Sequence, residues 1–128
     1  MSRNIKIEIG DIEVKAQLND SPTAGLIRDA LPIESVFNAW GDEVYFSIPV
    51  GAELECGREV VERGDLGYWP PGKAFCILYG KTPASQREEI RPASLVDIVA
   101  EVIGDQTVLK EAVCSSRCIR LERDQAFR

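Results

Sequence analysis

Strict alternation of apolar and polar residues marks the beginning of the chain. Isoleucines alternate with charged residues over residues 4–9, and residues 12–18 repeat the pattern after a Gly10-Asp11 turn. A period of two is typical of a strand with one buried face. The pattern therefore predicts an N-terminal β-hairpin, with its apolar side chains turned toward a core.

Two short helices are predicted between the strands. Pro22 suits a first helical position, because its missing N–H would be unpaired there, and Asp20 or Ser21 can cap this helix. Pro32 ends it, because proline cannot continue a helix. A second helix is predicted over residues 105–113. The apolar stripe expected on the first helix consists of Leu26, Ile27, Ala30 and Leu31.

The other apolar segments are short and predict strands. A second hairpin has arms over residues 33–40 and 43–48 around Gly41-Asp42, and Pro49 ends its second arm. Residues 74–79 are almost all apolar, which is typical of a strand buried on both faces. Further strands are expected over residues 50–56, 66–69, 94–103 and 117–122, and a surface loop over residues 80–93. Seven or eight short strands in one domain, residues 1–128, predict a barrel or a sandwich.

The overall charge narrows the classes of partner. The chain has 128 residues and a formal net charge of −6, with no long basic run, so nucleic acid is not an expected partner. No apolar stretch reaches the ~18 residues of a membrane span. The first residues lack the apolar core of a secretory signal, so a cytoplasmic protein is expected.

The chain contains no histidine. This removes the commonest general base and the commonest metal ligand together, so a Ser-His-Asp or Cys-His centre cannot be built within the chain. The Cys114 and Cys118 pair lacks the second close pair of a typical zinc site, and Cys76 is interpreted as a small buried apolar residue. No metal and no cofactor are expected.

Residues 67–73, GYWPPGK, match the phosphate-loop pattern G-x-x-x-x-G-K. That loop binds phosphates through successive backbone N–H groups, which Pro70 and Pro71 lack. Ala74 stands where the magnesium-binding hydroxyl would be, and a strand follows where the motif needs a helix. A nucleotide site is therefore not predicted.

The same region carries a resemblance to a known family. The segment GDLGYWPPGKAFCILYGKTP (64–83) resembles a family of small, uncharacterised cyclophilin-like proteins of bacteria and archaea, as do residues 35–50 and 91–102. The resemblance implies a mainly β fold, namely an eight-stranded antiparallel β-barrel with two short capping helices. The family is named for its fold, which does not by itself establish a function.

The resemblance also bears on catalysis. Cyclophilins that isomerise prolyl bonds carry F-H-R-x-x-P on one strand, and the similar strand here reads Tyr45-Phe46-Ser47-Ile48-Pro49. If the two strands superpose, Ser47 or a neighbour takes the place of the arginine, and a hydroxyl cannot supply the charge and the forked donors of a guanidinium. The nearest arginine downstream is Arg58. Prolyl isomerase activity is therefore not expected.

The leading hypothesis is a module that binds a small molecule or a peptide. Aromatic residues and prolines concentrate in two neighbouring segments, and such residues line ligand grooves. Trp69 is the best candidate for exposure, since a rigid Pro70-Pro71 turn follows it, and Lys73 could anchor an anionic group. The candidate ligand-binding residues are Trp40, Glu43, Tyr45, Phe46, Ser47, Trp69, Lys73 and Phe75.

Two other classes of function stay open. An enzyme could use the carboxylates of Asp42 and Glu43, or those of Glu53 and Glu55, and raised carboxyl pKa values in a cleft would favour it. A structural or regulatory subunit, including a homo-oligomer, would be favoured by an exposed apolar patch beside residues 66–79 or by an unpaired edge strand.

Overall fold

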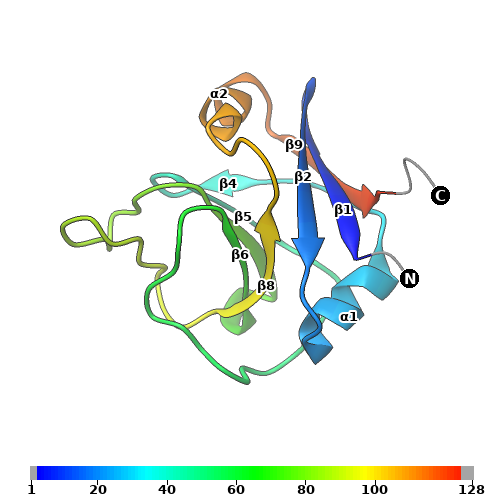
Figure 1. The fold of residues 1–128 in the computed structure, drawn as a ribbon, viewed down its shortest axis with the longest axis horizontal. Coiled ribbons are helices and arrows are strands. Elements are labelled where there is room, and N and C mark those ends of the chain that lie inside the picture. Colours follow the sequence, from blue (N-terminus) through cyan, green and yellow to red (C-terminus); the bar gives the residue numbers. More distant parts are fainter. Residues whose placement is uncertain (1–2, 125–128) are drawn as a thin grey trace.

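The computed structural model describes residues 3–124, which form one antiparallel sheet of nine strands, two α-helices and one turn of 3-10 helix (Figure 1). The helices are α1 (Pro22–Ala30) and α2 (Val108–Ser115), and the 3-10 turn is η1 (Pro70–Gly72). The strands are β1 (Asn4–Ile9), β2 (Ile12–Leu18), β3 (Ile33–Val36), β4 (Asn38–Ala39), β5 (Glu43–Ser47), β6 (Asp65–Trp69), β7 (Ala74–Leu78), β8 (Asp97–Val102) and β9 (Cys118–Arg123).

The sheet closes on itself through one bent segment of the chain. Its strand order is β3-β9-β1-β2-β8-β6-β7-β5-β4, and the two end strands are separated in sequence only by Phe37. The backbone N–H of Phe37 donates to the carbonyl of Arg117, 3.0 Å away, so the bend stays attached to the β9 side. Counted as one bent strand, β3 and β4 complete an eight-stranded antiparallel barrel, and the predicted fold class is confirmed.

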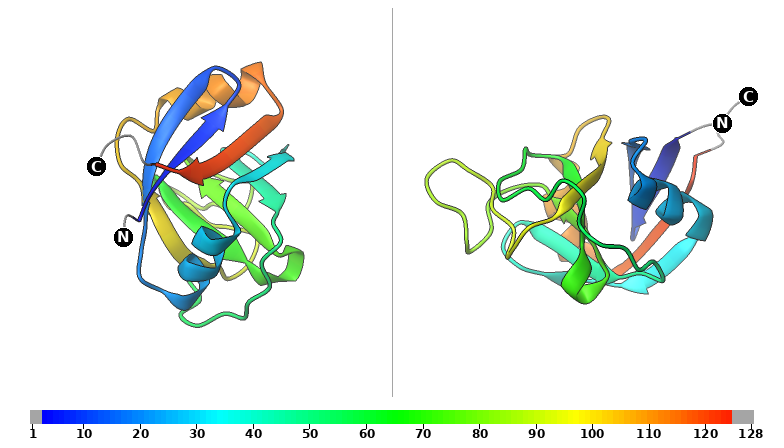
Figure 2. Two further views of the ribbon diagram at one scale, coloured as in Figure 1. Left: turned by 90° about the vertical axis from the view of Figure 1, so that its right-hand side faces the viewer. Right: turned by 90° about the horizontal axis from the view of Figure 1, so that it is seen from below.

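The predicted alternation places the core inside this barrel. Ile5, Ile7 and Ile9 of β1 are each at most 1% exposed, as the pattern of the first strand requires. Phe46 and Phe75 lie inside as well, with their ring centroids 5.7 Å apart. The two helices lie toward opposite ends of the barrel (Figures 1 and 2), so each covers part of an end that strands alone would leave open.

The start of α1 follows the predicted capping. The Ser21 hydroxyl accepts a hydrogen bond from the Ala24 N–H at 3.2 Å, and Pro22 occupies the first turn. The predicted apolar stripe is only partly right, because Leu26 is 47% exposed. The buried residues of α1 are Thr23, Ala24 and Ile27, so the buried face begins nearer the N-terminus of the helix than the predicted stripe.

Three other predicted elements differ from the structure. The arm over residues 33–40 is not one hairpin strand: β3 pairs with β9, and only β4 pairs with β5. Residues 50–56 form no strand, and their backbone is held by side chains instead, since Asp97 accepts hydrogen bonds from the N–H groups of Glu55 and Cys56 at 2.9 Å. The second helix begins three residues later than predicted, at Val108.

Strand β7 is buried on both faces, as its apolar run predicts. Phe75 and Ile77 belong to the barrel core, whereas Ala74, Cys76 and Leu78 belong to a second apolar cluster on the outer face. Covering that outer face requires further chain, and the long connections around residues 50–63 and 80–96 supply it. Figures 1 and 2 show the second of these connections extending away from the barrel.

Candidate functional site

The outer face of β5, β7 and β6 carries a set of side chains in register. Directly paired residues of an antiparallel sheet lie on the same face. Tyr45 pairs with Cys76 and Cys76 with Gly67 across the three strands, while Ala74 pairs with Trp69. Glu43 lies two residues before Tyr45 and therefore shares this outer face.

A pocket of about 320 Å³ opens over this part of the sheet. Its size falls at the lower end of the range of small-molecule sites. Three half-buried aromatic side chains, one buried carboxyl and one thiol meet there with residues of the loop that follows β7. The lining residues are Trp40, Glu43, Tyr45, Trp69, Cys76, Pro92, Ala93 and Val96.

The turn that carries Trp40 is fixed at both ends. The backbone N–H of Trp40 donates to the carbonyl of Glu43 at 2.9 Å. Within the turn, the N–H of Asp42 donates to the Lys81 carbonyl at 2.8 Å. The carbonyl of Asp42 accepts from the N–H of Tyr79 at 3.1 Å. Gly41 has a φ of 65°, a left-handed conformation that glycine adopts without strain. The turn therefore holds Trp40 at the rim independently of any ligand.

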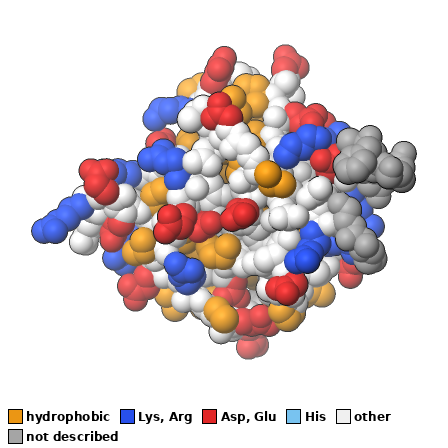
Figure 3. Space-filling view, viewed as in Figure 1, with side chains coloured by type: hydrophobic (Ala, Val, Ile, Leu, Met, Phe, Trp, Pro, Cys, Tyr) orange, Lys and Arg blue, Asp and Glu red, His pale blue; other side chains and the backbone are white. Residues whose placement is uncertain are grey.

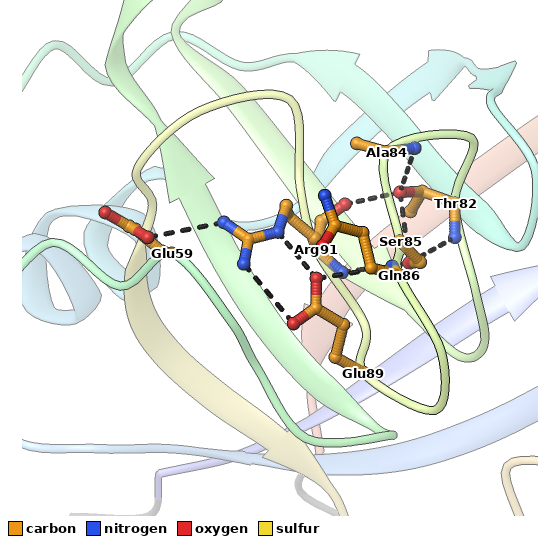
Figure 4. A network of polar contacts seen from close by, with 7 residues as sticks. All are labelled: Glu59, Thr82, Ala84, Ser85, Gln86, Glu89 and Arg91. Atoms are coloured by element: carbon orange, nitrogen blue, oxygen red, sulfur yellow. Dashed lines mark hydrogen bonds and ion pairs between the residues drawn. The ribbon is translucent and has the colours of Figure 1, made fainter.

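A polar network shapes the loop that forms the opposite wall (Figure 4). The Thr82 hydroxyl donates to the Arg91 carbonyl, and the Ser85 hydroxyl accepts from the N–H groups of Thr82 and Arg91 at 3.0 and 3.1 Å. The Arg91 guanidinium binds Glu89 at 2.6 Å and Glu59 at 3.3 Å. The loop, predicted only as a surface connection, thus has a defined internal structure directly before Pro92 and Ala93.

Two contacts seat the wall against the sheet. The Trp69 indole N–H donates to the Ser94 hydroxyl at 2.6 Å, so one aromatic side chain of the pocket is tied to the loop. Gly67 leaves room for Val96, since a Cβ at Gly67 would lie 3.1 Å from a methyl group of Val96. The backbone of Val96 also pairs with Arg58, which joins the wall to the other long connection.

Glu43 is the one Asp, Glu, Lys or Arg residue among the eight that line the pocket. It is 5% exposed, and its Oε1 atom is buried without a hydrogen-bond partner among the described residues. Burial raises the pKa of the carboxyl from 4.5 to about 7, and a hydrogen bond from the Cys76 thiol lowers it only in part. No ion pair among residues 3–124 includes Glu43, so this carboxyl changes charge near neutral pH.

Cys76 is not an activated nucleophile in this environment. Burial raises the pKa of its thiol strongly, and the negative charge of Glu43 and the hydrogen bond to it act in the same direction. A thiol must ionise to attack an electrophile or to bind a metal. Cys76 therefore contributes a hydrogen-bond donor to Glu43 and a small apolar surface to the pocket.

Comparison with known proteins places this chain in a family. A family model described as cyclophilin-like matches residues 3–122. The chain belongs to the cyclophilin-like family. The solution structure of a hypothetical protein from Archaeoglobus fulgidus is similar to it, with a TM-score of 0.79 and 36% sequence identity over 96% of this chain and 95% of that one. No curated protein matches the chain.

The predicted family and barrel of this cyclophilin-like protein are therefore confirmed, while its ligand-binding residues stay a prediction. The structure brings four of the eight candidates together around the pocket: Trp40, Glu43, Tyr45 and Trp69. It places Phe46 and Phe75 in the barrel core, with 2% and 0% exposed, so neither offers surface to a ligand in this conformation.

The last two candidates of the cyclophilin-like chain lie outside the pocket lining. Ser47 is exposed at the end of β5, and its hydroxyl donates to the carbonyl of Gly72 at 2.9 Å. Lys73 is exposed and adopts a left-handed backbone conformation with a φ of 48°, where it closes the turn η1. Both residues thus have local structural contacts beside the strand ends.

Sequence reasoning missed half of the lining. Cys76 is a small buried residue, as the sequence predicts, but its position between Phe75 and Ile77 places it on the other face of β7, where it lines the pocket. Pro92, Ala93 and Val96 come from a segment without regular periodicity, and only the family resemblance of residues 91–102 pointed to it. No local pattern reports which loop covers a sheet face.

Other sites in the cyclophilin-like protein carry less chemistry. No group of three or more His, Cys, Asp or Glu side chains within residues 3–124 is arranged to hold a metal ion. Within the same residues, no helix is long and apolar enough to cross a membrane. On the face seen in Figure 3, Lys and Arg side chains lie dispersed among Asp and Glu side chains.

Proposed function

We propose that this cyclophilin-like chain is a binding module whose outer pocket holds a small molecule or a peptide side chain, and that it lacks prolyl isomerase activity. The observation that carries the proposal is the pocket itself: about 320 Å³, mostly apolar, with three aromatic side chains and one buried carboxyl. Ligand sites combine an apolar lining with a few polar groups in this way.

The rigidity of the walls supports the same proposal. Trp40 is held by its turn, Trp69 by Ser94, and the loop before Pro92 by its polar network. A site whose walls are ordered before binding loses less conformational entropy when the ligand arrives. An accidental gap between mobile loops would not offer this advantage.

The chemistry of the lining supports the absence of isomerase activity. The eight lining residues include neither arginine nor lysine. Arg58 is exposed, and Arg91 is engaged with Glu89 and Glu59 in the loop network. The lining therefore offers no guanidinium to a prolyl substrate, which supports a binding role for this pocket without isomerase activity.

A thermal-shift screen with small apolar, aromatic and charged compounds tests the binding proposal. A ligand of the native protein raises its melting temperature in a concentration-dependent way. Trp69→Ala should remove the shift while the circular dichroism spectrum is retained. Ala93→Trp provides a second variant, since it adds bulk at an exposed position of the wall and fills the pocket without emptying the core. A compound that stabilises the wild type and Ala93→Trp equally would contradict binding in this pocket.

The ionisation of Glu43 favours an enzyme as the second candidate. A carboxyl in a pocket with a pKa of about 7 suits a general acid or base at neutral pH. The suggested pairing with Asp42 does not support it, because Asp42 lies next to Lys110, 3.4 Å away, and does not line the pocket. A reaction of this kind should depend on Glu43 alone: Glu43→Gln would abolish turnover but retain binding, and a pH–rate profile without an inflection near 7 would reject the role.

An exposed apolar patch favours the third candidate, a subunit of a complex. Leu54 and Leu95 are 38% and 39% exposed and lie with Pro70 and Pro71 around a shallow hollow beside β6. The nearly closed barrel leaves only the short end strands β3 and β4 with a single partner strand among the described residues, which disfavours pairing through a free sheet edge. Light scattering after size exclusion distinguishes the cases, since an oligomer formed through this patch should dissociate in Leu95→Glu.

A further inference from the structure

We propose that the outer pocket binds a methylated ammonium group, either on a small molecule or on a peptide side chain. This inference rests on the proposed function, because it names the ligand class for the same pocket. It is argued from three features of the pocket: a buried carboxyl without a counter-ion, the aromatic side chains around it, and the few oxygen acceptors that the lining side chains offer.

The first feature is the unsatisfied charge of Glu43. Its Oε1 is buried without a hydrogen-bond partner among the described residues, and only the Cys76 thiol is directed to the carboxyl. A buried carboxylate is unfavourable unless a cation or donors compensate it. The lining supplies no cationic side chain, so a cation bound in the pocket would be the partner that keeps this carboxyl ionised.

The second feature is the aromatic lining. Trp40, Tyr45 and Trp69 come from three different parts of the fold and meet around the same space as Glu43. The faces of aromatic rings attract cations, most strongly for tryptophan, and groups of such rings recognise quaternary ammonium ligands. Aromatic side chains and one carboxylate together favour a cation that carries apolar surface.

The third feature separates methylated ammonium from primary amines. A primary ammonium has three N–H donors, each of which needs an acceptor once it leaves water. The lining side chains offer two oxygen-bearing groups, the Glu43 carboxyl and the Tyr45 hydroxyl, whereas the indole N–H of Trp69 is a donor already bonded to Ser94. Methyl groups remove these N–H donors and fit the apolar remainder of the pocket.

The charge of the whole chain acts in the same direction. A formal net charge of −6 attracts small cations toward the protein and disfavours anions. An anionic ligand would in addition have to approach the Glu43 carboxylate at the base of the pocket. The pocket and the negative charge of the whole chain therefore both favour a cationic ligand.

Calorimetric titration of the full chain with matched probes tests the ammonium proposal. Choline carries a trimethylammonium group, and 3,3-dimethylbutan-1-ol has the same shape with a neutral carbon in place of the nitrogen. Choline should bind about tenfold or more tightly than the neutral probe. A trimethyllysine with blocked ends distinguishes the two sources, since tighter binding than choline indicates a peptide and weaker binding a free small molecule.

Variants assign the preference to Glu43. Glu43→Gln keeps the size of the side chain and should reduce the preference for choline to about onefold to threefold, while Glu53→Gln, at an exposed carboxyl of the loop after β5, should retain it. Trp69→Ala should weaken both probes together. Equal affinity for choline and the neutral probe would overturn the ammonium proposal and leave the binding module intact. Absence of choline binding, with other compounds still bound in the thermal-shift screen, would have the same meaning.

Discussion

The buried carboxyl of Glu43 makes the stability of the protein depend on pH in a predictable direction. Its folded pKa of about 7 lies above the ordinary value of 4.5 because burial disfavours the ionised form. Below pH 4.5 the group is protonated in the folded and the unfolded chain alike. Between pH 4.5 and 7 the unfolded chain ionises first, so the contribution of Glu43 to stability is progressively lost, and above pH 7 the loss is complete.

The size of the effect follows from the same two values. A rise from 4.5 to about 7 corresponds to about 3 kcal/mol at most, and water in the open pocket reduces this, so we expect about 1–3 kcal/mol. Glu43→Gln is neutral at every pH and lacks this contribution. The variant should therefore gain about 1–3 kcal/mol relative to the wild type between pH 4.5 and pH 8.

Urea unfolding followed by circular dichroism measures the difference at both pH values. The comparison cancels the contributions of groups that titrate in both proteins. Asp65 is one of them, since burial also raises the pKa of its carboxyl. Any loss of the contact with Cys76 contributes a nearly constant offset, so the change in the difference with pH is the decisive quantity. Glu53→Gln serves as the control with an exposed carboxyl. A difference between Glu43→Gln and the wild type that is the same at pH 4.5 and pH 8 would refute the reasoning.

Of three further predictions, the first concerns the barrel core and the other two concern the walls around the pocket. Tyr68→Phe should lower the free energy of unfolding in urea by about 1–3 kcal/mol. The buried hydroxyl donates to the Val50 carbonyl at 2.6 Å, and its removal would leave this carbonyl unpaired. Gly67→Ala should lower the melting temperature and weaken ligand binding, since its Cβ would lie 3.1 Å from Val96 and press on the wall; unchanged affinity would contradict this. Thr82→Val should speed amide exchange across residues 82–91 while the barrel strands exchange as before. The same exchange rates across residues 82–91 in the variant and the wild type would reject the role of the loop network.

Local patterns determined most of the barrel in advance. Alternation over residues 4–9 and 12–18 gave the bounds of β1 and β2 as the structure has them, because one face of each strand is buried and the other is not. The break at Phe37 was not predictable in this way. Residues 33–40 read as one extended segment, and the pairing of its two halves with different strands is set by the closure of the sheet, which is a long-range property.

The candidate site was predictable only as far as the alternation of side chains between the two faces of a strand was taken into account. Glu43 and Tyr45 are two residues apart and share the outer face, whereas Phe46 must lie on the opposite face of the same strand. Grouping Tyr45 with Phe46 in one site therefore conflicted with the predicted strand itself. The contribution of Cys76 needed the register between β5 and β7, which pairs it with Tyr45 and which no sequence pattern reports.

The apolar run of β7 links the fold to the pocket. A strand buried on both faces at the outside of a barrel requires a covering segment, and the loop before Val96 provides it by closing over Cys76. A fully apolar cover would have filled this face as a second core. Glu43 at the edge of that cluster, unpaired and surrounded by aromatic side chains, is instead unfavourable for stability. A residue that weakens the fold at neutral pH while completing a pocket does not serve the stability of the barrel, and this supports the proposed binding role of the pocket.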